Sequence, residues 1–163
     1  MTSRRTFLHL LRHADAGDPL AWAGPDDLRP LSANGEEQAE RVGAFLAASA
    51  VRPGAIVTSP RARALRTAEI VGAALGVPVR VDPVLAEEPG AKEIEALRVR
   101  AGAADPLLVG HDPWISLLVA DLCEAPGVRL AKGMLASVEL RGTVRGGDGR
   151  LRLLLTPELL APR

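Results

Sequence analysis

The sequence has little of several features that define large classes of proteins. It holds a single cysteine, Cys123, which cannot form an internal disulfide and which we expect to pack as a small hydrophobic side chain. Its 20 basic and 20 acidic residues cancel, so no overall attraction to nucleic acid or to an anionic membrane is expected. No apolar run approaches the length of a membrane span. These absences favour a cytoplasmic protein that binds neither nucleic acid nor membrane.

One pattern near the start is similar to an export signal. The stretch SRRTFL at residues 3–8 has the paired arginines of a twin-arginine signal. The apolar run that follows is interrupted by His9 and ends at Arg12, which is shorter than the hydrophobic region of a signal peptide. No small-residue cleavage site follows it, so we expect no export.

The chain does contain enough apolar material for one substantial core. Of its 163 residues, 47% are hydrophobic and 25% are charged, and we expect residues 1–163 to form one domain. Strand-like and helix-like segments alternate, which predicts a three-layer αβα sandwich with a mainly parallel central sheet and a C-terminal β-hairpin. The predicted strands cover 6–11, 55–58, 77–81, 106–109, 136–140 and 151–155. The predicted helices cover 33–49, 61–75, 92–101 and 113–123, and a long loop covers 15–31.

Local signals fix several of these helix ends. Ser32 is a good N-cap for the first helix, and Gly76 is a typical stop for the second. Asp112 is the expected N-cap of the fourth helix, with Pro113 at its first position, where a missing N–H costs nothing.

The first strand ends on an arginine and a histidine, Arg12 and His13. A guanidinium is permanently charged and can bind two phosphate oxygens at once, and a neutral imidazole nitrogen is a nucleophile at physiological pH. If His13 attacks with one ring nitrogen, the other is expected to donate to a backbone carbonyl or a similar acceptor. A dipeptide alone is a weak signal, so the interpretation depends on further cations and a proton donor elsewhere.

Three other places carry charged or titratable groups where a strand ends or a helix begins. Helix N-termini attract anions, and ligands of open α/β sheets bind beyond the carboxyl ends of the strands. We therefore expect these places to form one site with Arg12 and His13. They are Arg61, Arg63 and Arg66 at the start of the second helix, His111 after the strand over 106–109, and Glu87 and Glu88 after the strand over 77–81.

Four short motifs then support a family resemblance. Residues 12–14 (RHA) correspond to Arg-His-Gly, and residues 31–39 (LSANGEEQA) to Leu-Ser/Thr-x-x-Gly-x-x-Gln-Ala. Residues 59–67 (SPRARALRT) correspond to Ser-Pro-x-x-Arg-Ala-x-x-Thr, and Gly110-His111 to a second-histidine element. In this order, the motifs resemble those of the histidine phosphatase superfamily, also called phosphoglycerate mutase-like, and within it the small bacterial phosphohistidine phosphatases of the SixA type. The resemblance implies a phosphoglycerate mutase-like fold.

The resemblance also implies a role for each matching residue. His13 would be the nucleophile that becomes phosphorylated, and Arg12 and Arg63 would hold the phosphoryl oxygens. His111 would complete the pocket and stabilise the transferring group. Two guanidiniums, an imidazole and a helix N-terminus supply the charge that phosphoryl transfer needs, so no metal or other cofactor is expected.

The proton donor is less closely specified by the motifs. Glu87 occupies the family's Leu-x-Glu position and would protonate the leaving group and then activate water, with the adjacent Glu88 as the alternative. Ala14 replaces the family's glycine, which changes the backbone conformations open to that position. Asp15 and Asp18 would repel a phosphate, so we expect them to face away or to pair with arginine.

The substrate remains open at this stage. The short span between Glu87 and His111 leaves little room for a lid, which favours a phosphohistidine carried by a protein. The alternatives are a phosphatase or mutase acting on a small phosphorylated metabolite, and a phosphate-binding module without activity. We expect a monomer or a weak dimer.

Several conspicuous residues have simple structural explanations. His9 is expected to be a packed, hydrogen-bonded side chain rather than a metal ligand, because no suitable carboxylates accompany it. Arg66 is expected on the surface, whereas Arg61 could be either a surface residue or a phosphate ligand. Trp114 is expected to be buried, and Trp22 either packs on the core or lines the cleft.

Overall fold

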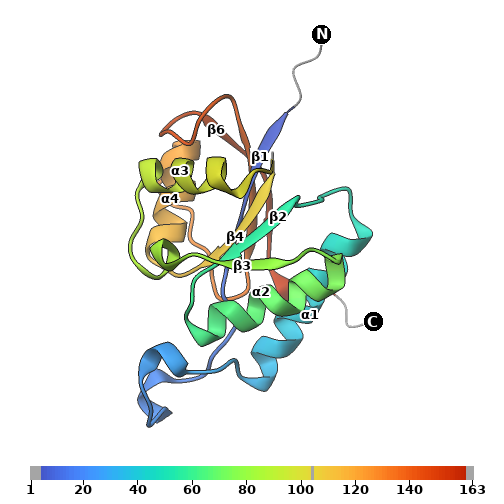
Figure 1. Cartoon of the computed structure of the whole chain (residues 1–163), viewed down its shortest axis with the longest axis vertical. Coiled ribbons are helices and arrows are strands. Elements are labelled where there is room, and N and C mark those ends of the chain that lie inside the picture. The colour runs from blue at the N-terminus through green and yellow to red at the C-terminus, as the bar shows by residue number, and fades with distance from the viewer. Residues whose placement is uncertain (1–4, 104, 161–163) are drawn as a thin grey trace.

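The computed structural model describes residues 5–103 and 105–160, which form a six-stranded sheet between helices (Figure 1). The strand order is β3-β2-β4-β1-β5-β6. The first four strands in that order are parallel, whereas β5 and β6 are antiparallel to their neighbours and form the C-terminal hairpin. The strands are β1 (Thr6–Arg12), β2 (Ala55–Thr58), β3 (Val79–Val81), β4 (Pro106–Gly110), β5 (Leu135–Leu140) and β6 (Gly149–Leu155).

Two helices cover each face of the sheet, which confirms the predicted three-layer sandwich (Figure 1). Helices α1 and α2 lie together on one face, and α3 and α4 lie on the other. Four short 3₁₀ segments complete the structure. The helices are α1 (Ala33–Ala48), α2 (Ala62–Leu75), α3 (Ala91–Ala101) and α4 (Trp114–Cys123), with η1 (Pro19–Ala21), η2 (Asp26–Leu28), η3 (Pro83–Ala86) and η4 (Pro157–Leu159).

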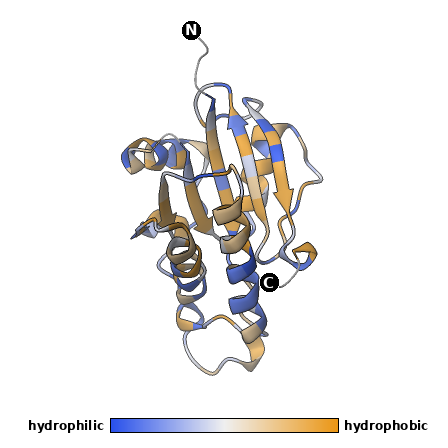
Figure 2. Cartoon of the chain, turned by 90° about the vertical axis from the view of Figure 1, so that its right-hand side faces the viewer, coloured by the Kyte–Doolittle hydropathy of each residue, from blue (hydrophilic) through white to orange (hydrophobic). Residues whose placement is uncertain are grey.

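Alternation along the strands divides the apolar side chains between two cores. Leu8 and Leu10 belong to the core under α3 and α4, whereas Leu11 belongs to the core under α1 and α2. All five residues of β4 are buried, as expected for a central parallel strand covered on both faces. Figure 2 shows hydrophobic colours along the strands and hydrophilic stretches on the helices.

The predicted helix caps are confirmed with one shift. The Ser32 hydroxyl accepts from the N–H of Gly35, and Gly76 ends α2 in the left-handed conformation. Helix α4 begins at Trp114, one residue later than predicted, with Pro113 at the cap position. Because proline has no side-chain acceptor, the Asp112 carboxylate serves instead by accepting from the N–H and hydroxyl of Ser116.

The third strand is shorter than predicted, since it begins at Val79 rather than at residue 77. The N–H of Val77 still donates to the carbonyl of Gly72 in the turn that ends α2, so it cannot join the sheet. Cys123 is half-buried against the core, as predicted. The pattern similar to an export signal begins at residues 3 and 4, outside the described residues. Within the described ranges, no helix combines the length and apolarity of a membrane span.

The register of the sheet brings the carboxyl ends of three neighbouring strands together. Arg12 at the end of β1 pairs with Gly110 at the end of β4, and Thr58 at the end of β2 pairs with Val109. Every segment that follows one of these strands therefore starts at the same edge.

Candidate active site

His13 follows β1 directly and is held by the backbone on both sides. Its N–H donates to the carbonyl of Gly110 at 2.9 Å, and its Nδ1 lies 2.7 Å from the carbonyl oxygen of Ala14. A carbonyl only accepts, so Nδ1 carries the proton, as predicted for a histidine that attacks through Nε2. No described residue forms a hydrogen bond with Nε2.

Burial keeps this imidazole neutral. His13 is 5% exposed, and desolvation lowers its pKa to about 3, with the positive charges of Arg63, Arg12 and Lys132 acting in the same direction. The hydrogen bond to Ala14 opposes this shift without reversing it. At physiological pH, Nε2 therefore keeps a free electron pair.

His111 follows β4 and faces the same point. Its ring centroid lies 5.2 Å from that of His13, and its Nε2 lies 2.7 Å from the hydroxyl oxygen of Ser59. Burial, followed by the charges of His13 and the neighbouring arginines, lowers its pKa to about 3. Gly110 is required before it, because a Cβ there would lie 2.1 Å from the ring of Trp114.

Arg12 and Arg63 approach the two imidazoles from different elements. Arg12 donates through one terminal nitrogen to the carbonyl of Leu130 at 2.7 Å and reaches Asp112 at 3.4 Å. Arg63 is only 4% exposed and donates to both the backbone carbonyl and the carboxylate of Asp26, at 2.8 and 3.0 Å. Burial lowers the Arg63 pKa, and the Asp26 charge opposes that change.

Buried side-chain nitrogens without a partner gather at this point. Among the described residues, five buried side-chain nitrogens form no hydrogen bond: Arg12 Nε, Arg61 Nε, Arg63 Nε, His111 Nδ1 and Trp114 Nε1. Buried polar groups are nearly always satisfied, so such a group signals a missing partner. Since the guanidinium nitrogens are donors and the surroundings are cationic, the partner that fits is an anion with several acceptor oxygens, as a phosphoryl group has.

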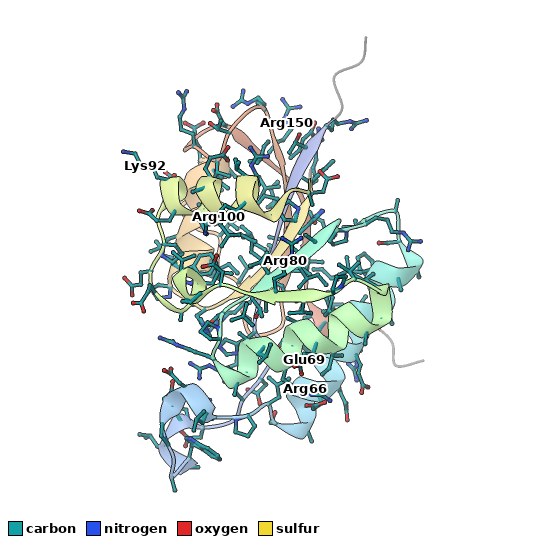
Figure 3. All side chains as sticks on the ribbon, in the orientation of Figure 1. Arg66, Glu69, Arg80, Lys92, Arg100 and Arg150 are labelled. Atoms are coloured by element: carbon teal, nitrogen blue, oxygen red, sulfur yellow. The ribbon has the colours of Figure 1, made fainter. Side chains whose placement is uncertain are left out.

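Of the other two arginines at the start of α2, Arg61 is near enough for its charge to act on His111, whereas Arg66 is not part of this cluster. Arg61 donates to the carbonyl of Ala86 and pairs with Asp27 at 3.1 Å, so it ties two loops together. Arg66 is on the surface, as predicted: it pairs with Glu36 at 2.8 Å and lies near Glu69 on the outer side of α2 (Figure 3).

The long loop supplies ion pairs that the sequence pattern did not predict. Asp26 and Asp27 in η2 pair with Arg63 and Arg61, which places this loop beside the start of α2 (Figure 1). Trp22 is 38% exposed and donates only to the carbonyl of Pro25 within the same loop. Of the two alternatives for Trp22, packing on the core is therefore excluded.

Asp15 is turned toward a lysine rather than an arginine, which corrects the predicted partner. Its carboxylate binds the Lys132 ammonium at 2.9 Å and the Ser32 hydroxyl at 2.6 Å, and these contacts lower its pKa to about 2. A Cβ on Gly35 would lie 1.9 Å from the Asp15 carbonyl oxygen, so only glycine allows α1 to approach this closely. The exposed Asp18 carboxylate accepts from the N–H of Leu20 and has no arginine partner among the described residues.

Glu87 and Glu88 are not brought into the cluster by any contact. Glu87 ends η3 and Glu88 follows it; both are exposed, and neither side chain forms a hydrogen bond or ion pair with a described residue. Their only link to the site is indirect, because the carbonyl of the preceding Ala86 accepts from Arg61.

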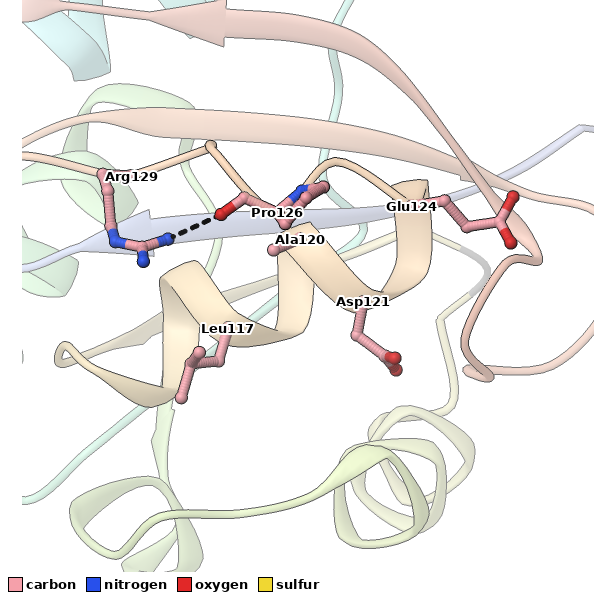
Figure 4. Close-up of a pocket in the computed structure, with 6 residues that line it drawn as sticks. All are labelled: Leu117, Ala120, Asp121, Glu124, Pro126 and Arg129. Carbon is pink, nitrogen blue, oxygen red and sulfur yellow. Dashed lines mark hydrogen bonds between the residues drawn. The ribbon is translucent and has the colours of Figure 1, made fainter.

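Two surface hollows lie along α4 rather than over His13. One, of about 480 Å³, is lined by residues of α4 and the segment after it, including Leu117, Asp121 and Arg129 (Figure 4). The other, of about 270 Å³, shares Leu117 and Asp121 and extends to Trp114 and Glu88. Trp114 is 4% exposed, as predicted for a buried residue.

Comparison with known proteins decides the family. The histidine phosphatase superfamily (branch 1) matches residues 8–93, more than half of the chain. The chain belongs to the histidine phosphatase superfamily. The match confirms the family resemblance inferred from the sequence motifs. The matched range includes Arg12, His13, Arg63 and Glu87 and ends before His111.

Individual members of this superfamily are similar over nearly the whole chain. Phosphohistidine phosphatase SixA from Escherichia coli (strain K12) is 29% identical over 156 residues, which cover 91% of this chain and 92% of that protein. A structure of the protein histidine phosphatase SixA complexed with tungstate superimposes with a TM-score of 0.80 at 29% identity, covering 95% of this chain and 99% of the other. These likenesses confirm the SixA type.

Solved structures of lower sequence identity are similar in fold. The structure of phosphoserine phosphatase in complex with 3-phosphoglyceric acid from Entamoeba histolytica has a TM-score of 0.71 at 19% identity, covering 93% of this chain and 97% of the other. Membership of the superfamily identifies the chain as a phosphatase and confirms the predicted phosphoglycerate mutase-like architecture.

Proposed function

We propose that this protein removes a phosphoryl group from a protein phosphohistidine through a covalent intermediate on its own His13. The observation that carries this proposal is the neutral, buried His13, whose Nδ1–H is engaged by Ala14, beside unpartnered nitrogens of Arg12, Arg63 and His111. This combination provides a nucleophile together with donors for the anion that it attacks.

The reaction then has two steps. In the first, the Nε2 electron pair of His13 attacks phosphorus, the bond from phosphorus to the leaving nitrogen breaks, and that nitrogen takes a proton. In the second, water attacks the phosphorus on His13, loses a proton and releases inorganic phosphate, which restores the imidazole. Arg12, Arg63 and His111 hold the non-bridging oxygens in both steps, so charge is stabilised without a metal.

Glu87 is the proposed source of the first proton and acceptor of the second, with Glu88 as the alternative. Both carboxyls are exposed, and neither forms a hydrogen bond or ion pair with a described residue. A leaving imidazole needs less help from an acid than an alkoxide does, so a loosely held carboxyl suits a phosphohistidine substrate.

The substrate class is supported by the absence of a large insertion near the site. Between Glu87 and His111 the described chain holds the 11-residue helix α3 and the strand β4. A protein-borne phosphohistidine can approach such an open edge, and the SixA relative bears the name of a phosphohistidine phosphatase. We also propose a single domain, a cytoplasmic location and a monomer or weak dimer.

The test is a parallel assay of wild type and His13→Ala. Both proteins are mixed with a histidine-containing protein phosphorylated on histidine, and separately with phosphoserine, phosphoglycerates and phosphosugars. We expect wild type to release phosphate fastest from the phosphoprotein and His13→Ala to release none. Faster turnover of a small metabolite would favour the alternative of a metabolite phosphatase or mutase.

A second measurement separates an enzyme from a module that only binds phosphate. Brief exposure to a radiolabelled activated phosphate ester, followed by alkaline denaturation, should leave one acid-labile phosphate on His13. Tungstate binding without any labelling would support the non-catalytic alternative.

A further inference from the structure

Ser59 lies immediately beyond β2, in the motif that precedes Arg63, and is completely buried. Its N–H donates to the carbonyl of Val109 at 3.0 Å, which fixes the residue against the end of β4. Its hydroxyl oxygen lies 2.7 Å from His111 Nε2 and 3.3 Å from the N–H of Arg61. Ser59 therefore touches His111 from the side opposite to its free nitrogen.

The hydroxyl has one proton, and the direction in which it points can be deduced. The N–H of Arg61 can only donate, so the Ser59 oxygen accepts that bond. Among the described residues, the only acceptor available to the Ser59 proton is His111 Nε2. If Nε2 carried a proton instead, the Ser59 oxygen could accept from it, but the buried Ser59 hydroxyl proton would then have no acceptor among the described residues, which is disfavoured.

We propose that Ser59 is a positioning residue that donates to His111 Nε2 and thereby holds the proton of this imidazole on Nδ1, where it donates to the phosphoryl oxygens. His111 Nδ1 is buried and unpartnered, beside the similarly unpartnered Nε groups of Arg12 and Arg63. The proposal rests on the proposed function, because it assigns the donor that faces the substrate in that site.

The placement of this proton matters because the ring is neutral. Burial and the neighbouring positive charges lower the His111 pKa to about 3, so the imidazole carries one proton and not two. A neutral ring with that proton on Nε2 would turn the lone pair of Nδ1 toward an anion and repel it. Ser59 allows an uncharged histidine to stabilise a phosphoryl group.

The direct test is nitrogen-15 NMR of histidine-labelled wild type near pH 7, with and without inorganic phosphate. We expect His111 to show a protonated Nδ1 and an unprotonated Nε2 in both samples. Assignment uses His111→Gln, which removes the signals. An Nε2–H tautomer in the wild type would overturn the proposal, whatever the catalytic rate.

Three variants link the tautomer to catalysis. Ser59→Ala should move the proton of His111 toward Nε2 and lower kcat about 10- to 100-fold, with a smaller change in KM. Ser59→Thr keeps the hydroxyl and should keep both the tautomer and a rate within about threefold of wild type. Thr58→Val removes the neighbouring buried hydroxyl, which donates to the Ser59 carbonyl, and should change stability without changing the tautomer.

The outcomes separate this inference from the proposed function. An unchanged kcat in folded Ser59→Ala, or a lowered kcat with the tautomer unchanged, would overturn the role of Ser59. A wild type with the Nδ1–H tautomer that neither labels His13 nor releases phosphate would contradict the proposed function alone, because the NMR measurement needs no turnover. If Ser59→Ala does not fold, the wild-type spectrum and Ser59→Thr still decide the question.

Discussion

On one side of the candidate site, His13, Arg63 and His111 are each at most 5% exposed, and each has a hydrogen bond to a neighbouring residue. On the other side, Glu87 and Glu88 are exposed, and their side chains form no hydrogen bond or ion pair with a described residue. We call these the phosphate side (Arg12, His13, Arg63 and His111) and the acid side (Glu87 and Glu88). The side chains of the phosphate side are held by hydrogen bonds in the structure without substrate, whereas we propose that those of the acid side gain contacts when substrate binds.

This difference follows from where each side is attached. The phosphate side consists of residues at the ends of β1 and β4 and in the first turn of α2, which are fixed by the sheet and its cores. The acid side is at the end of η3, a four-residue segment in which Leu85 is buried and the Ala86 carbonyl accepts from Arg61. Charge stabilisation requires fixed donors, but proton transfer to a nitrogen leaving group does not depend as strongly on a fixed acid.

The largest predicted effect is the loss of the nucleophile on the phosphate side. His13→Ala should lower kcat by about 10⁴-fold or more, since no other described group can take the phosphoryl group. Steady-state release of phosphate and retention of the circular dichroism spectrum measure this change. A folded variant that stays active would contradict the assigned mechanism.

The next effect should come from the buried arginine. Arg63→Ala should lower kcat/KM by about 10²- to 10³-fold, because it removes a donor to the non-bridging oxygens. Arg66→Ala is the matched control: it lies on the same helix but its side chain is 51% exposed and pairs with Glu36. Equal losses in the two variants would show that helix stability, rather than phosphate binding, explains the effect.

The acid side should respond less and in a manner that depends on the substrate. Glu87→Gln should slow hydrolysis of alkyl phosphates by about 10²-fold, because their alkoxide leaving groups need a proton, and should slow phosphohistidine turnover only a few-fold. Glu88→Gln is the control at the adjacent position. A uniform small effect of Glu87→Gln, together with a larger effect of Glu88→Gln, would transfer the role to Glu88.

The last prediction concerns stability in acid rather than turnover, and it should follow the buried histidines. The pKa of His9 is lowered to about 4 and those of His13 and His111 to about 3, with burial as the largest cause in each case. A histidine whose pKa is lower in the folded protein than in the unfolded chain binds a proton first in the unfolded chain. Lowering the pH therefore favours unfolding. The free energy of unfolding therefore has its full value above about pH 6.5. It decreases as the pH is lowered from about 6.5 to about 4, by up to about 1.4 kcal/mol per pH unit for each histidine.

Urea unfolding at several pH values measures this slope. His9→Gln should reduce it by up to about 1.4 kcal/mol per pH unit, since one titrating group is lost. His9 contacts Ser137 within the sheet and lies outside the phosphate side, so turnover should stay within a few-fold. An unchanged slope in His9→Gln would show that His9 titrates alike in the folded and unfolded states.

Sequence reasoning predicted the strands, the helices and the residues at the strand ends because these depend on local signals. Alternation of apolar residues, the Ser32 cap and the Gly76 stop are each contained within a few positions. Arg12, His13 and His111 could be placed together because the carboxyl ends of parallel strands share an edge.

The contacts that sequence reasoning missed join side chains far apart in the chain. Asp26 pairs with Arg63 at a separation of 37 residues, Lys132 with Asp15 at 117, and Ser59 with His111 at 52. Each contact depends on loop conformation or rotamer, which no periodic pattern encodes. The motif around Ser59 was a signal for its importance, but only the structure gives it a partner.

The pairing of β1 with β4 also has a consequence for how the protein acquires activity during synthesis. Arg12 and Asp112 meet across that pair although 100 residues separate them. A growing chain that has not yet produced β4 carries the nucleophile without the second imidazole, the Gly110 carbonyl or the closed sheet edge. On the proposed mechanism, phosphoryl transfer therefore requires that β1 and β4 have paired, so activity reports long-range strand pairing rather than local helix formation.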